Sequence, residues 1–251
     1  MTWILFPLIF LSGFMDSIAG GGGIISLTSY LAVGLPPHLA LGTNKTSAFL
    51  GTGISMARFA RKGHIRWDSA IVAFLGALAG SAAGARLALL VPERALVYIM
   101  LPVLPVIAAL VLRRKGFTPR TVALPRKGML AYSLVIGVLL GGYDGFFGPG
   151  TGTFLILAFT AMLGFDVLTA CGNAKAVNFA SNIAAAVTFI LNGQVNYALG
   201  VPAALCAIAG HYVGSGLAMK KGIRIVRPMI VVVIALLMAK IIWDLHTGAI
   251  G

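Results

Sequence analysis

Two lysines stand inside long apolar segments, where a lone positive charge is costly. Lys45 lies eight residues after Pro37 and thirteen before Arg58, which places it about 12 Å and about 20 Å from the two ends of a helix. Lys175 has an equivalent place in a later apolar segment. An uncompensated charge at such a depth in hydrocarbon costs about 2.5–3.5 kcal/mol or more. Each lysine therefore requires either a carboxylate partner or a cavity in which it attracts an anion.

Two aspartates are the candidate partners of these lysines. Asp16 and Asp144 each stand just before a glycine-rich break, within otherwise apolar sequence. As counter-ions they would hold a helix bundle together, and as titratable groups facing a cavity they would couple solute binding to protons. The residue pattern does not choose between these two roles.

The two glycine-rich breaks, at 20–23 and 148–152, could also bind an anion. Each precedes a short apolar segment, 24–35 in the first case and 152–164 in the second. A helix that begins at such a break points free N–H groups and its positive dipole end at the break, and glycine lets a ligand approach closely. The candidate backbone groups are those of Gly21, Gly22, Gly23, Gly150 and Thr151. No Gly-Lys-Ser/Thr follows either break, so the pattern does not favour a nucleotide.

Polar side chains recur on one face of the segment that carries Lys175. Lys175, Asn178 and Asn182 stand at positions i, i+3 and i+7, a helical spacing that forms one polar stripe. The segment of Lys45 keeps a fainter version with Thr52. We expect these stripes to face a common cavity rather than lipid.

Composition places these segments in a membrane. Of 251 residues, 59% are hydrophobic and only 10% charged, with a mean hydropathy of +0.98, whereas a soluble domain carries about 25% charged residues. The expected apolar segments are 2–19, 24–35, 38–60, 69–90, 94–112, 128–147, 152–164, 167–191, 199–219 and 223–245. Two of them, 24–35 and 152–164, are too short to span a bilayer alone, which predicts re-entrant helices.

The net charge of +13 indicates how the chain is oriented in the membrane rather than a nucleic-acid partner. Most of the Lys and Arg residues fall in three short clusters between apolar segments, a distribution that follows the positive-inside rule for cytoplasmic loops. The clusters are Arg58, Arg61, Lys62 and Arg66; Arg113, Arg114, Lys115, Arg120, Arg126 and Lys127; and Lys220, Lys221, Arg224 and Arg227. A nucleic-acid patch would need an aqueous domain to present it, and no stretch is long enough.

The order of these features predicts an internal repeat of inverted orientation. The aspartate, the glycine break and the lysine recur in the same order at shifts of 128 to 130 residues. The loop at 58–66 is strongly basic, whereas its counterpart at 192–198 carries no charge, so we expect equivalent loops on opposite sides of the membrane. A repeat of equal orientation remains an alternative.

The expected fold is an all-α polytopic membrane protein with two inverted-topology repeats, each a glycine-broken short-helix hairpin followed by three transmembrane helices. Residues 1–112 would form the first repeat, 113–127 a basic cytoplasmic linker, and 128–251 the second repeat. Both termini would then lie outside. Glycine pairs spaced by four, Gly76/Gly80/Gly84 and Gly210/Gly214, predict close helix packing either within the fold or in a homo-oligomer.

The sequence carries no pattern typical of an enzyme, a metal site or a cofactor site. The histidines His38, His64, His211 and His246 are scattered and mostly near segment ends, and no HExxH motif occurs. Cys171 and Cys206 lack metal-ligand spacing and are interpreted as small buried residues. We expect a protein without catalytic activity, metal or cofactor.

Three motifs together resemble the TauE/SafE sulfite exporter family, also called TSUP, and especially its YfcA-like branch. They are the run from Asp16 through the four glycines to Ile25, the Thr43-Asn44-Lys45 element, and the run from Tyr143 through Asp144 to Gly152. The resemblance covers about residues 8–246. It implies movement of sulfur oxyanions or organosulfonates, such as sulfite, across the bacterial cytoplasmic membrane.

The resemblance also implies which residues form the site. By transfer onto matching positions these are Thr43, Asn44 and Lys45, with Gly172, Asn173 and Lys175 from the second half. The halves differ here, because Gly-Thr-Asn-Lys is replaced by Gly-Asn-Ala-Lys. We therefore expect a secondary transporter of a small anion that works by alternating access, with an anion channel or a non-transport intramembrane protein as alternatives.

Overall fold

The computed structural model describes residues 2–92, 95–96 and 124–222, together with 224–226, 228–229 and 232. These residues form α-helices and no strand, which confirms the all-α class. The helices are α1 (Thr2–Ala19), α2 (Gly23–Ala32), α3 (Pro37–Arg61), α4 (Trp67–Leu90), α6 (Arg126–Phe146), α7 (Thr151–Leu163), α8 (Val167–Leu191) and α9 (Tyr197–Lys221). The predicted segments 94–112 and 223–245, the linker and the C-terminus lie largely or wholly outside the described residues.

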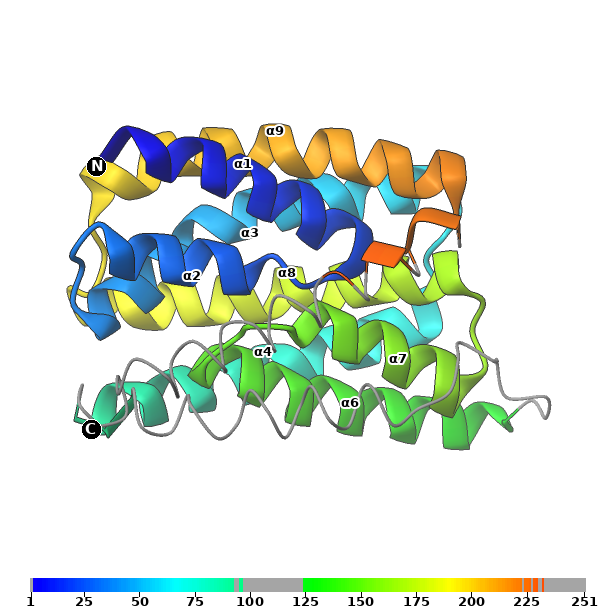
Figure 1. The fold of residues 1–251 in the computed structure, drawn as a ribbon. Helices are drawn as coiled ribbons and strands as arrows, with labels where there is room; N and C mark the ends of the chain where they lie inside the picture. Colours follow the sequence, from blue (N-terminus) through cyan, green and yellow to red (C-terminus); the bar gives the residue numbers. More distant parts are fainter. Residues whose placement is uncertain are drawn as a thin grey trace.

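The two short helices follow the two glycine breaks, as predicted. α2 has 10 residues and α7 has 13, so at about 1.5 Å per residue each reaches only about 15–20 Å. Gly20 after α1 has φ 78°, and Gly150 before α7 has φ 82°, a left-handed conformation that side chains rarely adopt. The chain reverses at both breaks, so α2 runs back beside α1 and α7 beside α6 (Figure 1).

Within the part of the chain that the structure describes, four helices are long and apolar enough to cross a membrane: α4, α6, α8 and α9. The best spanning window of α8 is 67% buried, against 39–44% for the other three, so α8 is the central one. α3 has the same length as α8, 25 residues, but a lower mean hydropathy, because it carries Arg58 and Arg61 in its last turn in addition to Lys45. The chain is therefore a multi-pass membrane protein with a polar central helix.

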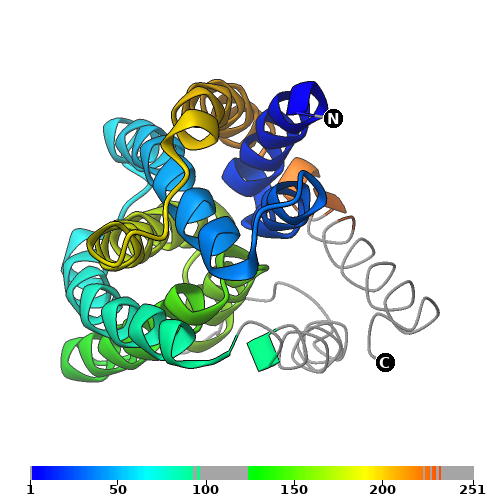
Figure 2. The same cartoon turned by 90° about the vertical axis from the view of Figure 1, so that its left-hand side faces the viewer.

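Each half of the chain packs against the other half. α1 lies along α9, and α4 lies along α6, while α3 and α8 contact each other in the centre. Figure 2, which looks along the helices, shows the central pair between these two outer pairs. The predicted repeats are thus interlocked rather than separate bodies.

Rows of glycines let the helices of the two outer pairs, α1 with α9 and α4 with α6, pack closely against each other. A Cβ added at Gly80 or Gly84 of α4 would overlap the carbonyl oxygen of Val138 or Gly142 on α6. Gly210 of α9 meets α1 in the same way, and so does Gly214. These small residues therefore serve packing within the chain, which resolves the choice that the sequence left open.

The long helices run in two opposite directions. In Figure 1, α1, α3 and α9 run from left to right, whereas α6, α8 and α4 run from right to left. The end of α3, the start of α6 and the end of α9 consequently lie at the same end of the molecule. The described basic clusters gather there: Arg58, Arg61, Lys62, Arg66, Arg126, Lys127, Lys220, Lys221 and Arg224.

Candidate substrate-binding cavity

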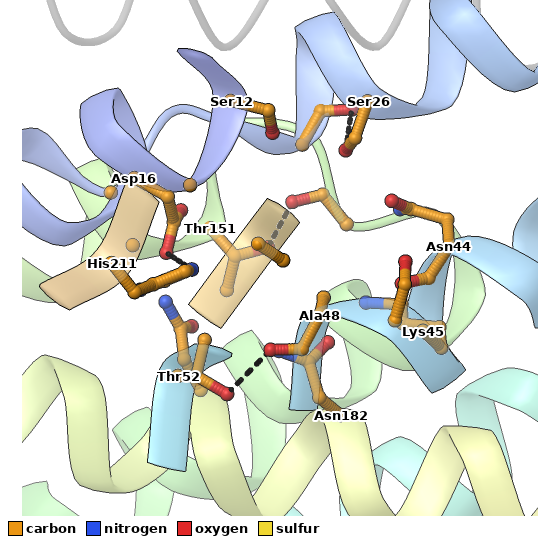
Figure 3. Close-up of a pocket in the computed structure, with 18 of the residues that line it drawn as sticks. Ser12, Asp16, Ser26, Asn44, Lys45, Ala48, Thr52, Thr151, Asn182 and His211 are labelled. Carbon is orange, nitrogen blue, oxygen red and sulfur yellow. Dashed lines mark hydrogen bonds and ion pairs between the residues drawn. The ribbon is translucent and has the colours of Figure 1, made fainter. Parts of the chain in front are cut away.

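A small polar cavity lies between the two halves. Its volume is about 50 Å³, which is room for roughly three to five water molecules. Polar and charged side chains from both halves line it: Ser12, Asp16, Ser26, Asn44, Lys45, Thr52, Asp144, Thr151, Asn178, Asn182 and His211. Figure 3 shows Asp16 and His211 on one side, Asn44 and Lys45 on the other, and Thr151 between them. A cavity of this size and polarity suits a small polar solute.

The two glycine breaks meet at this cavity. The backbone N–H of Thr153 donates to the carbonyl of Gly20 at 3.3 Å, and the Thr153 hydroxyl donates to Ala19 at 2.7 Å. Gly20 and Gly152 touch so closely that a Cβ on either would overlap the other backbone. Gly23 and Gly152 line the cavity, so the positive ends of α2 and α7 converge on it from opposite halves.

One buried ion pair joins α3 of the first half to α6 of the second. Lys45 Nζ lies 2.8 Å from Asp144 Oδ1, and the two side chains are 3% and 6% exposed. The Ser181 hydroxyl of α8 donates to the other carboxylate oxygen of Asp144. Lys45 and Asp144 both line the cavity, so a ligand would meet this pair directly.

A second buried ion pair joins α8 of the second half to α1 of the first. Lys175 Nζ lies 2.8 Å from Asp16 Oδ2 and also donates to the backbone carbonyl of Asp16. The Lys175 side chain is fully buried and is not among the lining residues, whereas Asp16 is. The two pairs thus repeat one design, in which the lysine of each half binds the aspartate of the other.

These pairs answer the question that the sequence left open about the lysines. Each lysine has an aspartate partner, as the structural alternative expected. The two lysines and two aspartates cancel, so the cavity has no surplus charge from these four groups. Lys45 keeps access to the cavity, but Lys175 holds α8 against α1.

Three asparagines line the cavity: Asn44 of α3 and Asn178 and Asn182 of α8. Of the stripe predicted on α8, Asn178 and Asn182 lie at the cavity, whereas Lys175 does not line it. The side-chain oxygens of Asn44 and Asn178 are buried and have no hydrogen-bond partner among the described residues. An amide can turn either its oxygen or its NH₂ toward a ligand. Because buried polar groups are normally paired, these two atoms point to a bound solute or water.

The other predicted site residues do not line the cavity. The Thr43 hydroxyl accepts the backbone N–H of Asn196 at 2.9 Å, and Asn173 donates to the Thr169 carbonyl at 2.9 Å. Gly22 accepts from the Ser12 hydroxyl at 2.7 Å, whereas Gly21 and Gly150 shape the breaks. A Cβ at Gly172 would overlap the His64 carbonyl, so its role is close packing. These residues position helices and loops around the cavity.

His211 is the titratable cavity residue that sequence reasoning missed. It stands in the middle of α9, only 2% exposed, so the interpretation of the histidines as residues near segment ends is wrong for it. Its Nε2 lies 3.7 Å from Asp16 Oδ2, and its Nδ1 lies 2.9 Å from the Ser55 hydroxyl. The sequence could have indicated this residue, because a histidine inside an apolar membrane helix is expected to be paired or functional.

The lining residues do not resemble a metal centre. Within the described ranges, no group of three or more His, Cys, Asp and Glu side chains could hold a metal ion. Cys171 is buried and Cys206 half-buried, and both are free thiols.

Comparisons with known proteins agree on one family. The model of the family described as "Sulfite exporter TauE/SafE" matches residues 5–241. A "Probable membrane transporter protein ORF9" from Sinorhizobium sp is 38% identical over 240 residues, which cover 96% of this chain and 92% of that protein. No solved structure matches.

Two further relatives carry similar names. A "Probable membrane transporter protein" from Haemophilus influenzae is 37% identical and covers 96% of this chain and 94% of its own length. The "Probable membrane transporter protein YfcA" from Escherichia coli is 36% identical, and the match covers 97% of this chain and 90% of that protein. The family model spans both halves of the chain, residues 5–241. The chain belongs to the TauE/SafE sulfite exporter family of membrane transporters.

Proposed function

We propose that the protein is a secondary transporter that carries a small anion, a sulfur oxyanion or an organosulfonate such as sulfite, through the cavity by alternating access. The observation that carries this proposal is the set of hydrogen-bond donors around a cavity of about 50 Å³ that two halves of the chain share. The family name supports the sulfur oxyanion. No step of the proposal requires catalysis or a cofactor.

The donors favour an anion over a cation. Lys45 Nζ, the amide groups of Asn44 and Asn178, and the first turns of α2 and α7 all border the same space. Helix N-termini and ammonium groups are the usual ligands of oxyanions in proteins. The oxygens of a sulfite or sulfonate could each accept from a different donor, so the paired carboxylates need not leave their lysines.

The repeats provide the means of alternating access. Residues 1–112 and 128–251 act as inverted repeats joined by the 113–127 linker, and one half rocks against the other. Support comes from the opposite directions of α1 and α6, of α3 and α8, and of α4 and α9 (Figure 1). The ion pairs and the contact between the glycine breaks cross from one half to the other, so they are the contacts that such a motion must rearrange.

The charge distribution orients the protein in the membrane. The end that gathers the described basic clusters faces the cytoplasm of a bacterial cell, because short basic loops stay on that side of the inner membrane. The N-terminus lies at the opposite end in Figure 1 and is therefore outside. The same orientation puts the uncharged 192–196 loop outside.

Flux measurements test the transporter and its site together. Purified protein in liposomes loaded with unlabelled thiosulfate or sulfite should accumulate external labelled anion by counterflow. A channel would give flux without counterflow. The Asn178→Ala variant should lose about tenfold or more in apparent affinity, because one hydrogen bond to a charged ligand contributes about 1.5–3 kcal/mol.

The matched control is Asn192→Ala, an exposed asparagine at the end of the same helix. It should transport like the unaltered protein. Absence of flux for every sulfur oxyanion and sulfonate would refute the proposed substrate class. Equal affinity in the Asn178→Ala and Asn192→Ala variants would refute the site.

A further inference from the structure

The two ion pairs differ in the third group that touches the aspartate. The third group at Asp144 is the hydroxyl of Ser181, which donates a hydrogen bond to the carboxylate and does not titrate near neutral pH. Asp16 has the imidazole of His211, at 3.7 Å from Nε2 to Oδ2. That distance is longer than a hydrogen bond, and Asp16 Oδ2 accepts a hydrogen bond from Lys175 Nζ at 2.8 Å. The ring therefore stands beside a carboxylate that could receive a second cation.

The surrounding residues are shaped to hold this ring. A Cβ at Gly51 of α3 would overlap the ring carbon Cδ2, and one at Gly13 of α1 would lie 3.0 Å from the same atom. The Ser55 hydroxyl lies 2.9 Å from Nδ1 on the other side of the ring. At a shift of 130 residues, Ser181 replaces Gly51 and Ser81 replaces His211. The equivalent place beside Asp144 thus has a serine instead of the ring, and a serine instead of the glycine that leaves space for it.

The charge balance of the cavity gives the ring a role. The pairs Lys45–Asp144 and Lys175–Asp16 cancel, so with a neutral imidazole the cavity is neutral. An anion that enters a neutral, buried site leaves an uncompensated charge in a low-dielectric region. One proton on His211 changes the balance to one positive charge, which a monovalent anion neutralises.

We infer that His211 binds a proton when the anion binds in the cavity, so that one proton accompanies each anion. This inference rests on the proposed anion transport and names its coupling ion. The proton comes from solvent to the imidazole. The doubly protonated ring then donates from Nδ1 to Ser55 and faces Asp16 with Nε2. No bond other than the N–H bond forms.

The charged groups that face His211 are consistent with this role. Asp16 of α1 is its nearest carboxylate, and Lys175 of α8 shares that carboxylate. From α3, Lys45 reaches the same cavity with its partner Asp144 of α6. Among the described residues, Arg58 of α3 is a further cation close to this part of α9, and it lies over the ring of Tyr212, 3.9 Å from its centroid.

Calorimetric titration counts the protons directly. The probes are methanesulfonate, ethanesulfonate and isethionate, monovalent anions that stay fully ionised between about pH 5 and about pH 8, so any pH dependence of binding comes from the protein. Titrations in buffers of different ionisation enthalpy give the number of protons taken up per anion. We expect one proton per anion near the alkaline end of this range. Apparent affinity should then fall about tenfold per pH unit.

Two substitutions assign the proton to His211. His211→Gln, or His211→Asn if the longer amide does not fit, should bind the probe with a proton count of zero and no pH dependence. The control His64→Gln alters a half-buried histidine in the loop before α4 and should keep one proton per anion. Correct folding is checked by gel filtration of the detergent-solubilised protein.

The outcomes separate this inference from the proposed function. Binding without proton uptake in the unaltered protein would overturn the inference and leave anion transport intact. One proton per anion that persists in the His211 variant would move the proton to an aspartate and overturn the role of His211. Absence of binding of all three probes at every pH would overturn the proposed sulfur-anion substrate itself, and the inference with it.

Discussion

The two buried ion pairs occupy matching places in the two halves, yet they are completed differently. Lys175 is fully buried, and its aspartate faces the imidazole of His211. Lys45 reaches the cavity, and its aspartate is held by the Ser181 hydroxyl. The two ion pairs share one arrangement of lysine and aspartate, and only the pair at Asp16 has a titratable third partner. We interpret the His211 side as the proton side and the Lys45 side as the anion side.

Removal of a buried lysine should have the largest effect. Lys175→Met leaves the Asp16 carboxylate without its partner in the membrane interior, and loss of one member of a buried pair costs about 3–5 kcal/mol. Lys45→Met should cost less, because Asp144 borders a cavity that can admit water. Unfolding of the purified variants in detergent, followed by circular dichroism, measures both losses.

A double substitution is the control for this effect. Asp16→Asn combined with Lys175→Met removes both charges and should recover most of the lost stability. Equal losses in the two single-lysine variants would contradict the difference that we draw between the sites.

Removal of the Ser181 hydroxyl should have the next largest effect on stability. Ser181→Ala removes a hydrogen bond to a charged carboxylate, which contributes about 1.5–3 kcal/mol. Anion affinity should fall with it, because Asp144 and Lys45 are held together at the cavity. Calorimetry should still find one proton per anion, since the His211 side is untouched. A change in the proton count would show that the two sides are not independent.

Gly51 tests the space that the ring needs. Gly51→Ala places a Cβ against the His211 ring, and such overpacking costs about 1–3 kcal/mol. The displaced ring should no longer lie beside Asp16, so the pH dependence of anion binding should weaken. The matched control is Gly142→Ala on α6, where the nearest atom would be 3.5 Å away. Similar behaviour of the two variants would refute the packing argument.

The smallest effect is expected at Ser55. Ser55→Ala removes the hydrogen bond to Nδ1 of His211, which contributes about 0.5–1.5 kcal/mol. The variant should fold and bind anion, but with a different pH at which affinity begins to fall. Calorimetry across the same pH range measures that change. An unaltered pH profile would mean that the Ser55 bond does not influence protonation of the ring.

Much of the fold could be predicted because membrane segments and glycine breaks leave strong local signals. The short helices after 20–23 and 148–152 follow from length and glycine content alone. Of the predicted polar stripe Lys175, Asn178 and Asn182, the two asparagines line the cavity, whereas Lys175 is buried against Asp16 and does not line it. The pairing of the halves depends on contacts between residues far apart in the sequence, such as Gly80 with Val138 and Lys175 with Asp16, and no local pattern encodes those.

The site was harder to predict, because residues near a motif are not all at the cavity. Thr43 and Asn173 flank the lysines in sequence, but a helix turns them toward neighbouring backbone. His211 was overlooked because nothing next to it in sequence is polar except Tyr212. Its partners Asp16 and Ser55 come from two other helices, so their meeting appears only in three dimensions.

The most direct test of the account is the position of a bound anion. Selenate is an oxyanion with a strong anomalous signal, so diffraction from crystals grown with it would locate the site. We predict a selenium peak in the cavity, with its oxygens about 3 Å from Lys45 Nζ and the Asn178 amide. A peak only at the basic end, near Arg58 and Arg66, with none in the cavity, would contradict the proposed site.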